Sequence, residues 1–314
     1  MGRRRKTGRS VHGVFLLNKP IGLTSNQALQ RVRRLFDANK AGHTGALDPL
    51  ATGVLPLCLG EATKFSQFLL DSNKYYRSTF TFGISTATGD SEGDIIAQQD
   101  ASNITKQQIE NAMQAFIGDI EQIPSMYSAL KHNGQPLYKL ARKGIDIERP
   151  ARNITVFEYQ LLNYRPSTNP EVDVQVHCSK GTYIRSLAAD LGAALGCGAH
   201  VSKLHRHKAG PFEECHAITL DELERLRSEG PADQLDRLLM PMDTPISHLP
   251  YVEFDKVTAG YLQLGQSVTS NKAFRQGQEG DIVRVFREGG DFLGIGTITE
   301  EGKVAPKRLI VEDA

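Results

Sequence analysis

The chain has 314 residues, of which 39% are apolar and 23% charged, and its formal net charge at pH 7 is +1. This composition is typical of a globular protein with room for one large and one small domain. The sequence contains no apolar run long enough to cross a membrane, no recognisable cleavable leader and no C-x-x-C pair among its four cysteines. We therefore expect a cytoplasmic protein with reduced thiols.

Positive charge is concentrated in three parts of the sequence. Lys and Arg predominate in residues 1–40, 131–152 and 180–208, whereas acidic residues gather between Glu213 and Asp243. Such segregation is what a groove for a phosphate backbone needs. Solvated helix faces and a flexible basic tail at residues 1–10 are the alternative explanation. The pattern favours the groove.

The N-terminal part of the chain is predicted to alternate strands and helices. Thr24 with Gln27, and Thr105 with Gln108, are capping boxes that mark helix starts. Residues 83–94 form a polar loop. The remaining apolar periodicity predicts a strand at 11–18, a helix at 62–70 and a strand at 74–82.

Residues 121–152 have a different character. Prolines and glycines interrupt every periodic pattern, and Lys and Arg are interleaved with Tyr127 and Tyr138. A long functional loop that contains one short helix is the expected structure.

The C-terminal part is predicted to contain further strands and helices and a domain boundary near 243–251. A helix begins near Ile184, and Thr219 with Glu222 forms a third capping box. Strands are expected at 154–164 and 172–178 and, in a small barrel or roll, at 281–286, 292–298 and 307–312. The irregular alternation favours the α+β class.

One short loop carries the strongest chemical signal. Residues 43–53, HTGALDPLATG, hold Asp48 between glycines, and Pro49 restricts the backbone that follows. Asp48 is the only carboxylate between Lys40 and Leu59, which disfavours the paired carboxylates of ordinary glycosidases and favours one nucleophile or base. Taken alone, Asp-Pro is also a common turn.

An aspartate that must stay ionised in an apolar loop needs a cation nearby, because burial raises its pKa. Arg185 and Lys19, both beside predicted turns, are the candidates. His43 could fix the loop or contact a ligand. Tyr76 could be a core aromatic residue or could stack on an extracted base.

Histidines and cysteines near residue 200 do not form a recognisable metal site. The spacing of Cys197, His200, His205, His207 and Cys215 fits no standard zinc pattern. Residues 205–208, HRHK, are predicted to be a basic rim instead. No metal or cofactor is expected, because the sequence also lacks a Walker loop and a dinucleotide fingerprint.

Five motifs, in order, resemble those of the TruB family of pseudouridine synthases. The resemblance runs from residue 11 to about residue 250, and the C-terminal segment is more loosely similar to a PUA-type RNA-binding domain. The motifs are residues 42–53, 18–20 with 23–25, 74–77 with 86–90, 124–131 with 138–144, and 178–187.

The resemblance implies a fold and a division into domains. We expect a pseudouridine synthase fold, with a central mixed, largely antiparallel sheet flanked by helices, over residues 11–248. An RNA-gripping insertion would lie at about 121–152, and a small β-rich PUA-like domain at 251–314.

The resemblance also implies an activity. The expected reaction converts one uridine of tRNA, at position 55 in the T loop, to pseudouridine without a cofactor. Asp48 would be the catalytic nucleophile and Arg185 its ion-pair partner. Tyr76 would stack on the flipped base and help to move a proton.

Binding residues follow from the same resemblance. Tyr183 and Leu204 would line the uridine pocket, and His43 would occupy the space that the base leaves. Lys19 and Pro20 would support the catalytic loop. The expected enzyme is a monomer that binds tRNA without an obligate protein partner, and a tRNA-folding chaperone role is compatible with it.

Two other functions share these features. A non-catalytic RNA chaperone would use the fold without the reaction, and a guide-dependent synthase of the archaeal and eukaryotic ribonucleoprotein type would share the catalytic loop. The insertion at 121–152 resembles the stand-alone bacterial form.

Overall fold

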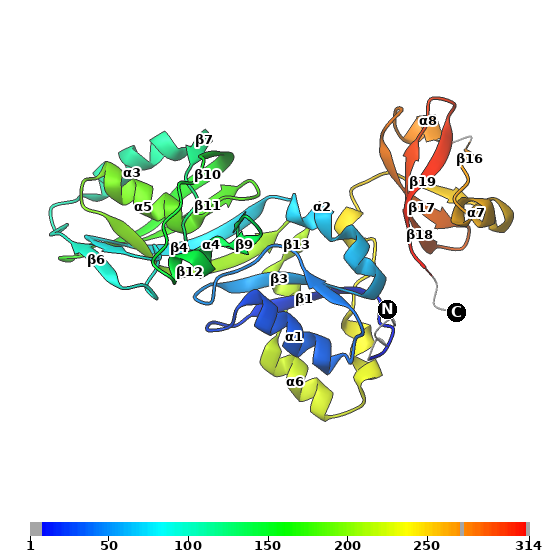
Figure 1. Ribbon diagram of the computed structural model, residues 1–314, viewed down its shortest axis with the longest axis horizontal. Coiled ribbons are helices and arrows are strands. Elements are labelled where there is room, and N and C mark those ends of the chain that lie inside the picture. Colours follow the sequence, from blue (N-terminus) through cyan, green and yellow to red (C-terminus); the bar gives the residue numbers. More distant parts are fainter. Residues whose placement is uncertain (1–7, 271–272, 312–314) are drawn as a thin grey trace.

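Two β-sheets organise the protein. The computed structural model describes residues 8–270 and 273–311. A ten-stranded sheet extends through the larger part of the molecule, and a five-stranded sheet lies at one end (Figure 1). No helix within the described residues is both long and apolar enough to span a membrane.

The large sheet has the strand order β14-β1-β3-β12-β4-β11-β10-β7, with β2 on β3 and β13 on β12. Neighbouring strands are antiparallel except for β1 with β14 and β3 with β12, which are parallel. This confirms the expected mixed, largely antiparallel sheet. The strands are β1 (Gly13–Lys19), β2 (Ala41–His43), β3 (Thr52–Leu59), β4 (Lys74–Phe82), β7 (Gly118–Gln122), β10 (Arg152–Arg165), β11 (Glu171–Cys178), β12 (Ala199–Ala209), β13 (Phe212–Glu213) and β14 (Ile218–Thr219).

Helices cover the sheet in two groups. In Figure 1, α3 and α5 lie against the part of the sheet that contains β4, β10 and β11, and α1 and α6 lie together near β1 and β3. The helices are α1 (Ser25–Leu35), α2 (Ser66–Leu70), α3 (Lys106–Met113), α5 (Ile184–Ala194) and α6 (Leu220–Ser228), with 3-10 turns η1 (Gly60–Phe65), η2 (Gln114–Phe116), η3 (Glu214–His216), η4 (Ala232–Leu238) and η5 (Thr244–Ile246).

Two of the three predicted capping boxes form completely. Thr24 and Thr105 each accept a hydrogen bond from the N3 backbone N–H, and the side-chain oxygen of the N3 glutamine accepts one from the backbone N–H of the threonine. At α6 only half of the box forms: Thr219 accepts from the Glu222 N–H, but the Glu222 carboxylate binds Arg225 instead. The predicted helix at 62–70 begins as the 3-10 turn η1 and becomes α-helical only in α2.

Strands with one exposed face alternate between buried and more exposed residues, whereas strands covered on both faces are apolar and buried throughout. Along β11, buried and half-buried residues alternate as predicted, with Val172 and Val176 in the main core. In β1, Phe15 points into the main core, whereas Val14 points into a second cluster on the opposite face of the sheet.

Two central strands were not predicted from the sequence. The run that forms β3 does not alternate and contains Gly53 and Pro56, so it lacks the usual signal of a strand. Pro56 has no N–H to donate, and it lies just beyond the paired residues of β2, where its carbonyl accepts the Thr44 N–H, at 3.2 Å. In β12, buried and half-buried residues alternate regularly from Leu204 to His207, but the polar histidines and cations give no apolar alternation in the sequence.

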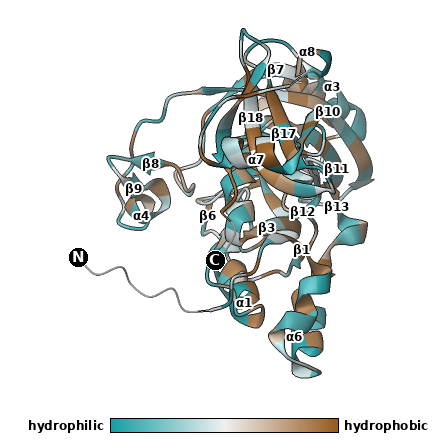
Figure 2. Cartoon of the chain, turned by 90° about the vertical axis from the view of Figure 1, so that its right-hand side faces the viewer, coloured by the Kyte–Doolittle hydropathy of each residue, from teal (hydrophilic) through white to brown (hydrophobic). Residues whose placement is uncertain are grey.

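The predicted insertion forms a small unit of its own. It contains the hairpin β8 (Lys131–His132) and β9 (Gln135–Pro136) and the short helix α4 (Leu137–Ala141), which stand apart from the main body in Figure 2. Met126, Leu137 and Leu140 are its core.

The loop predicted at 83–94 contains a short strand, β5 (Ile84–Thr86). This strand pairs with β6 (Ile95–Gln98), which follows the loop.

The five-stranded sheet has a separate apolar core, which includes Val252 and Val285. Phe292 meets Phe65 of η1 with 5.2 Å between ring centroids, and Arg284 pairs with Asp243 at 2.8 Å. The last strand begins earlier than predicted, and position 312 lies outside the described residues. The elements are β15 (Tyr251–Phe254), β16 (Val268–Thr269), β17 (Ile282–Arg287), β18 (Asp291–Ile298), β19 (Lys303–Leu309), α7 (Lys256–Gln263) and α8 (Ala273–Gln276).

Candidate active site

A pocket of about 260 Å³ opens where the loop after β2 meets β4, β12 and the first turn of α5. Five of the predicted site residues line it, although they come from distant parts of the sequence. They are Asp48, Tyr76, Tyr183, Arg185 and Leu204.

The loop that carries Asp48 is held by its own backbone and by α1. The Leu47 N–H donates to the Ser25 hydroxyl at 2.7 Å, and that hydroxyl donates to the Leu47 carbonyl at 3.1 Å. The Ala51 N–H closes a turn onto the Asp48 carbonyl at 3.0 Å. Gly45 has a φ of +82°, which a residue with a side chain rarely adopts. These contacts fix where the carboxylate points.

Arg185 is the cation beside that carboxylate. Its Nε lies 2.9 Å from Asp48 Oδ2, and its side chain is only 5% exposed, against 40% for Asp48. The other guanidinium nitrogens donate to the carbonyls of Thr88, at 2.8 Å, and Tyr127, at 2.9 Å. Burial raises the pKa of the Asp48 carboxyl, and the Arg185 guanidinium opposes that shift. The pair therefore favours a carboxylate that stays ionised at the pocket.

A second carboxylate, which the sequence analysis did not anticipate, lies on the far side of Arg185. Asp90 is 3% exposed, and its Oδ2 lies 3.7 Å from an Arg185 terminal nitrogen. The Thr88 hydroxyl and the Glu92 N–H bind its Oδ1. Asp48 is thus the single carboxylate of its own loop, as the sequence indicates, but it shares Arg185 with Asp90, which does not line the pocket. A glycosidase-like pair facing the pocket does not result.

Lys19, the other candidate cation, supports the loop and does not pair with Asp48. Its side chain is fully buried, and its Nζ donates to the carbonyls of Pro20, at 2.8 Å, and Leu23, at 2.6 Å. The Pro49 carbonyl lies at the longer distance of 3.5 Å. Burial lowers the pKa of Lys19 to about 8.

Tyr76 and Tyr183 enter the pocket from different elements. Tyr76 lies on β4 and is 9% exposed. Tyr183 is the N-cap residue of α5, and its backbone N–H and carbonyl both bind the side-chain amide of Gln122, at 2.8 and 3.0 Å. Two hydrogen bonds from the Gln122 side chain, at the end of β7, thus fix the backbone of the tyrosine at the N-terminus of α5.

His43 and Pro20 do not line the pocket. His43 ends β2 and is half-buried, and its buried Nδ1 has no hydrogen-bond partner among the residues that the structure describes. Burial lowers the pKa of its imidazole, which favours the neutral ring. Pro20 follows β1 and contributes its carbonyl to Lys19.

Arg206 is the main residue that sequence reasoning placed wrongly. It belongs to the predicted basic rim, yet it is 1% exposed and lines the pocket. The alternation of β12 would have revealed this, because Leu204 and Arg206 share the buried face. On the other face, His205 and Lys208 pair with Glu214 and Glu213.

No group of three or more His, Cys, Asp or Glu side chains in residues 8–270 and 273–311 is placed to hold a metal ion. His205 Nδ1 lies 2.8 Å from the Thr52 hydroxyl, and His200 Nδ1 lies 3.0 Å from the Ile84 carbonyl. These ring nitrogens serve to join strands.

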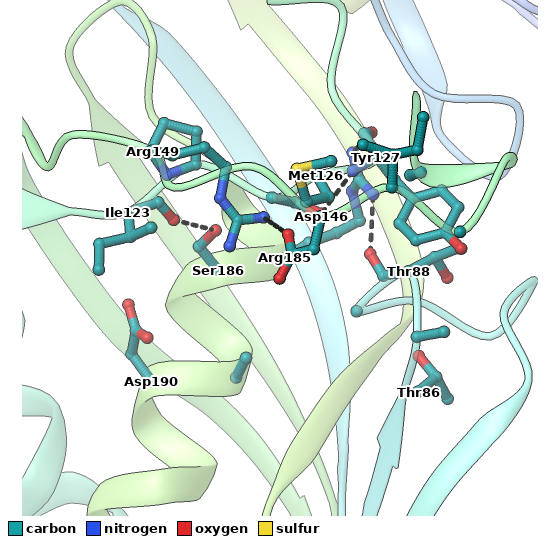
Figure 3. A pocket seen from close by; sticks show the side chains of 18 residues that line it. Thr86, Thr88, Ile123, Met126, Tyr127, Asp146, Arg149, Arg185, Ser186 and Asp190 are labelled. Atoms are coloured by element: carbon teal, nitrogen blue, oxygen red, sulfur yellow. Dashed lines mark hydrogen bonds and ion pairs between the residues drawn. The ribbon is translucent and has the colours of Figure 1, made fainter. Parts of the chain in front are cut away.

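A larger cavity of about 510 Å³ lies between the insertion and α5. Figure 3 shows Arg185 with its bonds to the Thr88 and Tyr127 backbone, and Arg149 paired with Asp146, both from the insertion. The Ser186 hydroxyl donates to the Ile123 carbonyl at 3.1 Å. Arg185 therefore joins the loop that carries Asp48, the loop after β5 and the insertion.

The fold and this pocket place the protein among the pseudouridine synthases. A solved Cbf5–Nop10–Gar1 complex contains a chain that is 27% identical, with a TM-score of 0.68 over 96% of this chain and 84% of that one. The archaeal box H/ACA Nop10–Cbf5 structure, at 24% identity and a TM-score of 0.68 over 98% and 92% of the two chains, shares the fold.

Sequence relatives give the family. Residues 33–184 match the TruB family pseudouridylate synthase N-terminal domain, and residues 185–247 and 250–310 match two TruB C-terminal domains. Proteins named tRNA pseudouridine synthase B are 56% identical in Saccharophagus degradans and 50% in Pseudomonas aeruginosa, over 99% of each chain. In Yersinia pestis the identity is 51%, over 99% of this chain and 96% of the relative. This chain belongs to the TruB family.

Proposed function

We propose that this protein converts the uridine at position 55, in the T loop of tRNA, to pseudouridine. The Asp48–Arg185 pair at the pocket is the observation that carries the proposal, because it provides one ionised carboxylate where a flipped-out base would enter. The 50–56% identity to proteins named tRNA pseudouridine synthase B supports tRNA as the substrate.

Asp48 acts as the nucleophile in this proposal. Its carboxylate attacks C1′ of the ribose, and the N1–C1′ bond breaks with its electron pair on N1. The base turns, C5 bonds to C1′ and the Asp48–C1′ bond breaks. C5 then loses its proton, with help from Tyr76, and N1 gains one. Substrate and product have the same atoms, so no cofactor is needed.

The remaining pocket residues bind the base. Tyr76, Tyr183 and Leu204 surround the space beside Asp48, where an aromatic surface would stack on an unpaired uracil. His43 fills the position that the base leaves in the T loop, and Lys19 keeps the catalytic loop in place through its bonds to Pro20 and Leu23.

The binding surface extends over both ends of the molecule. The insertion at about 121–152 and the PUA-like domain at 251–314 hold the T arm, and the enzyme works as a single chain in the cytoplasm. Phosphate contacts dominate such binding, so the affinity falls steeply with salt.

The experiment uses the purified full chain, a transcribed tRNA and no guide RNA, with pseudouridine mapped by carbodiimide labelling. A tRNA with cytidine at position 55 is the control. The proposal predicts one modified uridine, at position 55, and no modification of the control RNA. Modification of another position would exclude the assigned target.

A guide-dependent synthase is the second candidate, because the solved structures with the same fold include Cbf5 complexes with protein partners. It predicts no conversion without a guide RNA. The same experiment therefore separates the two functions, and tight tRNA binding without conversion would favour a chaperone.

A further inference from the structure

Arg206 carries a buried positive charge that pairs with no carboxylate among the described residues. Its guanidinium is 1% exposed, and none of the carboxylates in the described part of the chain forms an ion pair with it. A guanidinium keeps its charge in proteins, and burying a charge without an opposite partner is costly. Such a residue calls for an explanation beyond packing.

Two neutral carbonyls satisfy part of the guanidinium. Its Nε donates to the Val54 carbonyl at 2.8 Å, and a terminal nitrogen donates to the Gly45 carbonyl at 3.1 Å. The backbone of Arg206 is also tightly enclosed: a Cβ at Gly53, where φ is +102°, would lie 2.2 Å from the Arg206 carbonyl oxygen. Arg206 is thus tied to both ends of the loop that carries Asp48.

The remaining side of the guanidinium faces the pocket, next to Tyr76. The two residues are direct partners in the register of β12 and β4, so their side chains lie on the same face of the sheet.

Electrostatics links the pair. Burial raises the pKa of the Tyr76 hydroxyl, and the Arg206 guanidinium lowers it. The other charged or titratable groups that act on this hydroxyl, Asp48 and the Cys178 thiol, raise its pKa. Arg206 is therefore the group that stabilises a Tyr76 phenolate in this pocket, against the net rise that burial gives to the pKa of the hydroxyl.

We propose that Arg206 is a positioning residue that acts through Tyr76, by stabilising the phenolate that takes the proton from C5 of the substrate base. This rests on the proposed function. In the step, the C5–H proton moves to the Tyr76 oxygen, and the C–H electron pair restores the C5–C6 double bond of the ring. Tyr76 becomes a neutral phenol, which returns its proton to water, and N1 takes one from water.

The test is a double-mutant cycle in the full chain. Single-turnover rates of tRNA pseudouridylation are measured for Arg206→Gln, Tyr76→Phe and the double variant. Because a nearby charge shifts a pKa by about 1–3 units, Arg206→Gln should slow the reaction roughly a hundredfold at neutral pH. In the Tyr76→Phe background it should add less than about threefold, since the hydroxyl is already absent.

Tyr159→Phe is the matched control background. Tyr159 is also a buried tyrosine, on β10, but it lies outside the pocket. The full loss caused by Arg206→Gln should persist there. If the losses of Arg206→Gln and Tyr76→Phe multiply, Arg206 does not act through Tyr76 and the inference fails.

Two further readouts separate this role from a structural one. Removing the cation raises the pKa of Tyr76 further, so the alkaline limb of the pH–rate profile should move to higher pH in Arg206→Gln, whereas a distorted loop would lower the rate without moving the profile. Arg206→Lys keeps the charge and should stay within about tenfold of wild type; it also replaces Arg206→Gln in the cycle if that variant does not fold. Equal losses for both substitutions would overturn the inference, whereas an inactive wild type would instead refute the proposed function.

Discussion

The pocket has two walls that are built differently. The sheet wall consists of the Asp48 loop and the buried faces of β4 and β12, and hydrogen bonds hold the backbone of the Asp48 loop and the Arg206 side chain in place. The insertion wall contributes Ser128 and Ala129 from a unit with a small core of its own. It joins the body through a few bonds, such as Arg185 to the Tyr127 carbonyl.

We infer from this difference that the sheet wall serves the reaction and that the insertion wall serves RNA binding. The sheet wall holds the charged groups in place before any substrate arrives, which is what electrostatic preorganisation requires. The insertion wall has few long-range contacts, so its position is the easier of the two to change. Substitutions in the sheet wall should therefore reduce the rate, and substitutions in the insertion should reduce the affinity.

Replacing Arg185 with Met should have the largest effect of the substitutions that test this division. It removes the partner of Asp48 and leaves Asp90 buried without its cation, so we expect about 3 kcal/mol less stability and a rate loss on the order of a thousandfold. Arg165→Met, at a more exposed ion pair, is the control and should cost less than about 1 kcal/mol. Equal effects in urea unfolding would contradict the account.

Tyr76→Phe retains the aromatic ring and removes only the hydroxyl. If that hydroxyl moves a proton, the single-turnover rate should fall on the order of a hundredfold while tRNA affinity stays within a few-fold. Tyr159→Phe removes another buried hydroxyl and should not change the rate. A Tyr76→Phe enzyme as fast as wild type would leave stacking as the sole role of Tyr76.

Lys19 connects the sheet wall to the pH dependence of stability. Its folded-state pKa is about 8, below its usual value of 10.5, so between these pH values the unfolded state binds more protons and the free energy of unfolding rises with pH. Burial also lowers the pKa of Lys74 to about 8, so Lys74 adds to the same pH dependence. Relative to Lys19→Met, wild type should gain up to about 3 kcal/mol over this range. If the free energies of unfolding of the two proteins, measured in urea, depend on pH in the same way, Lys19 is not a buried ammonium with a lowered pKa.

Leu137→Ala in the insertion should have the smallest effect on the reaction. Leu137 is 4% exposed in the small core, and truncation should loosen that unit by about 2 kcal/mol without disturbing the main core. We expect tRNA affinity to fall several-fold and the rate at saturating tRNA to change less than about twofold. A large rate loss at saturation would mean that the insertion wall also sets the chemistry.

The sequence was sufficient to predict helix starts and alternating strands, because their signals come from residues a few positions apart. The capping boxes at Thr24 and Thr105 and the alternation in β11 depend on residues close in sequence, and they form as expected. The strand β3 is buried on both faces, so it shows no alternation. Its assignment depends on neighbours that only the tertiary fold supplies.

The site shows the same limit. Five predicted residues line one pocket because ordered motifs identify a loop, a strand and a helix start. Asp90 and Arg206 were assigned no such role. Asp90 contacts Arg185, and Arg206 is the cross-strand partner of Tyr76, and both of these partners lie far away in sequence. A charged residue on the buried face of a strand was the signal that was available for Arg206.

The central claim is that a preorganised Asp48 carboxylate performs the reaction, and Asp48→Asn tests it most directly. The substitution keeps the size and shape of the side chain and removes its charge. Wild type and variant are compared with the same transcribed tRNA, by conversion at position 55 in a single turnover and by binding. We predict no detectable conversion by the variant, with tRNA affinity within a few-fold of wild type; conversion at the wild-type rate would contradict the account.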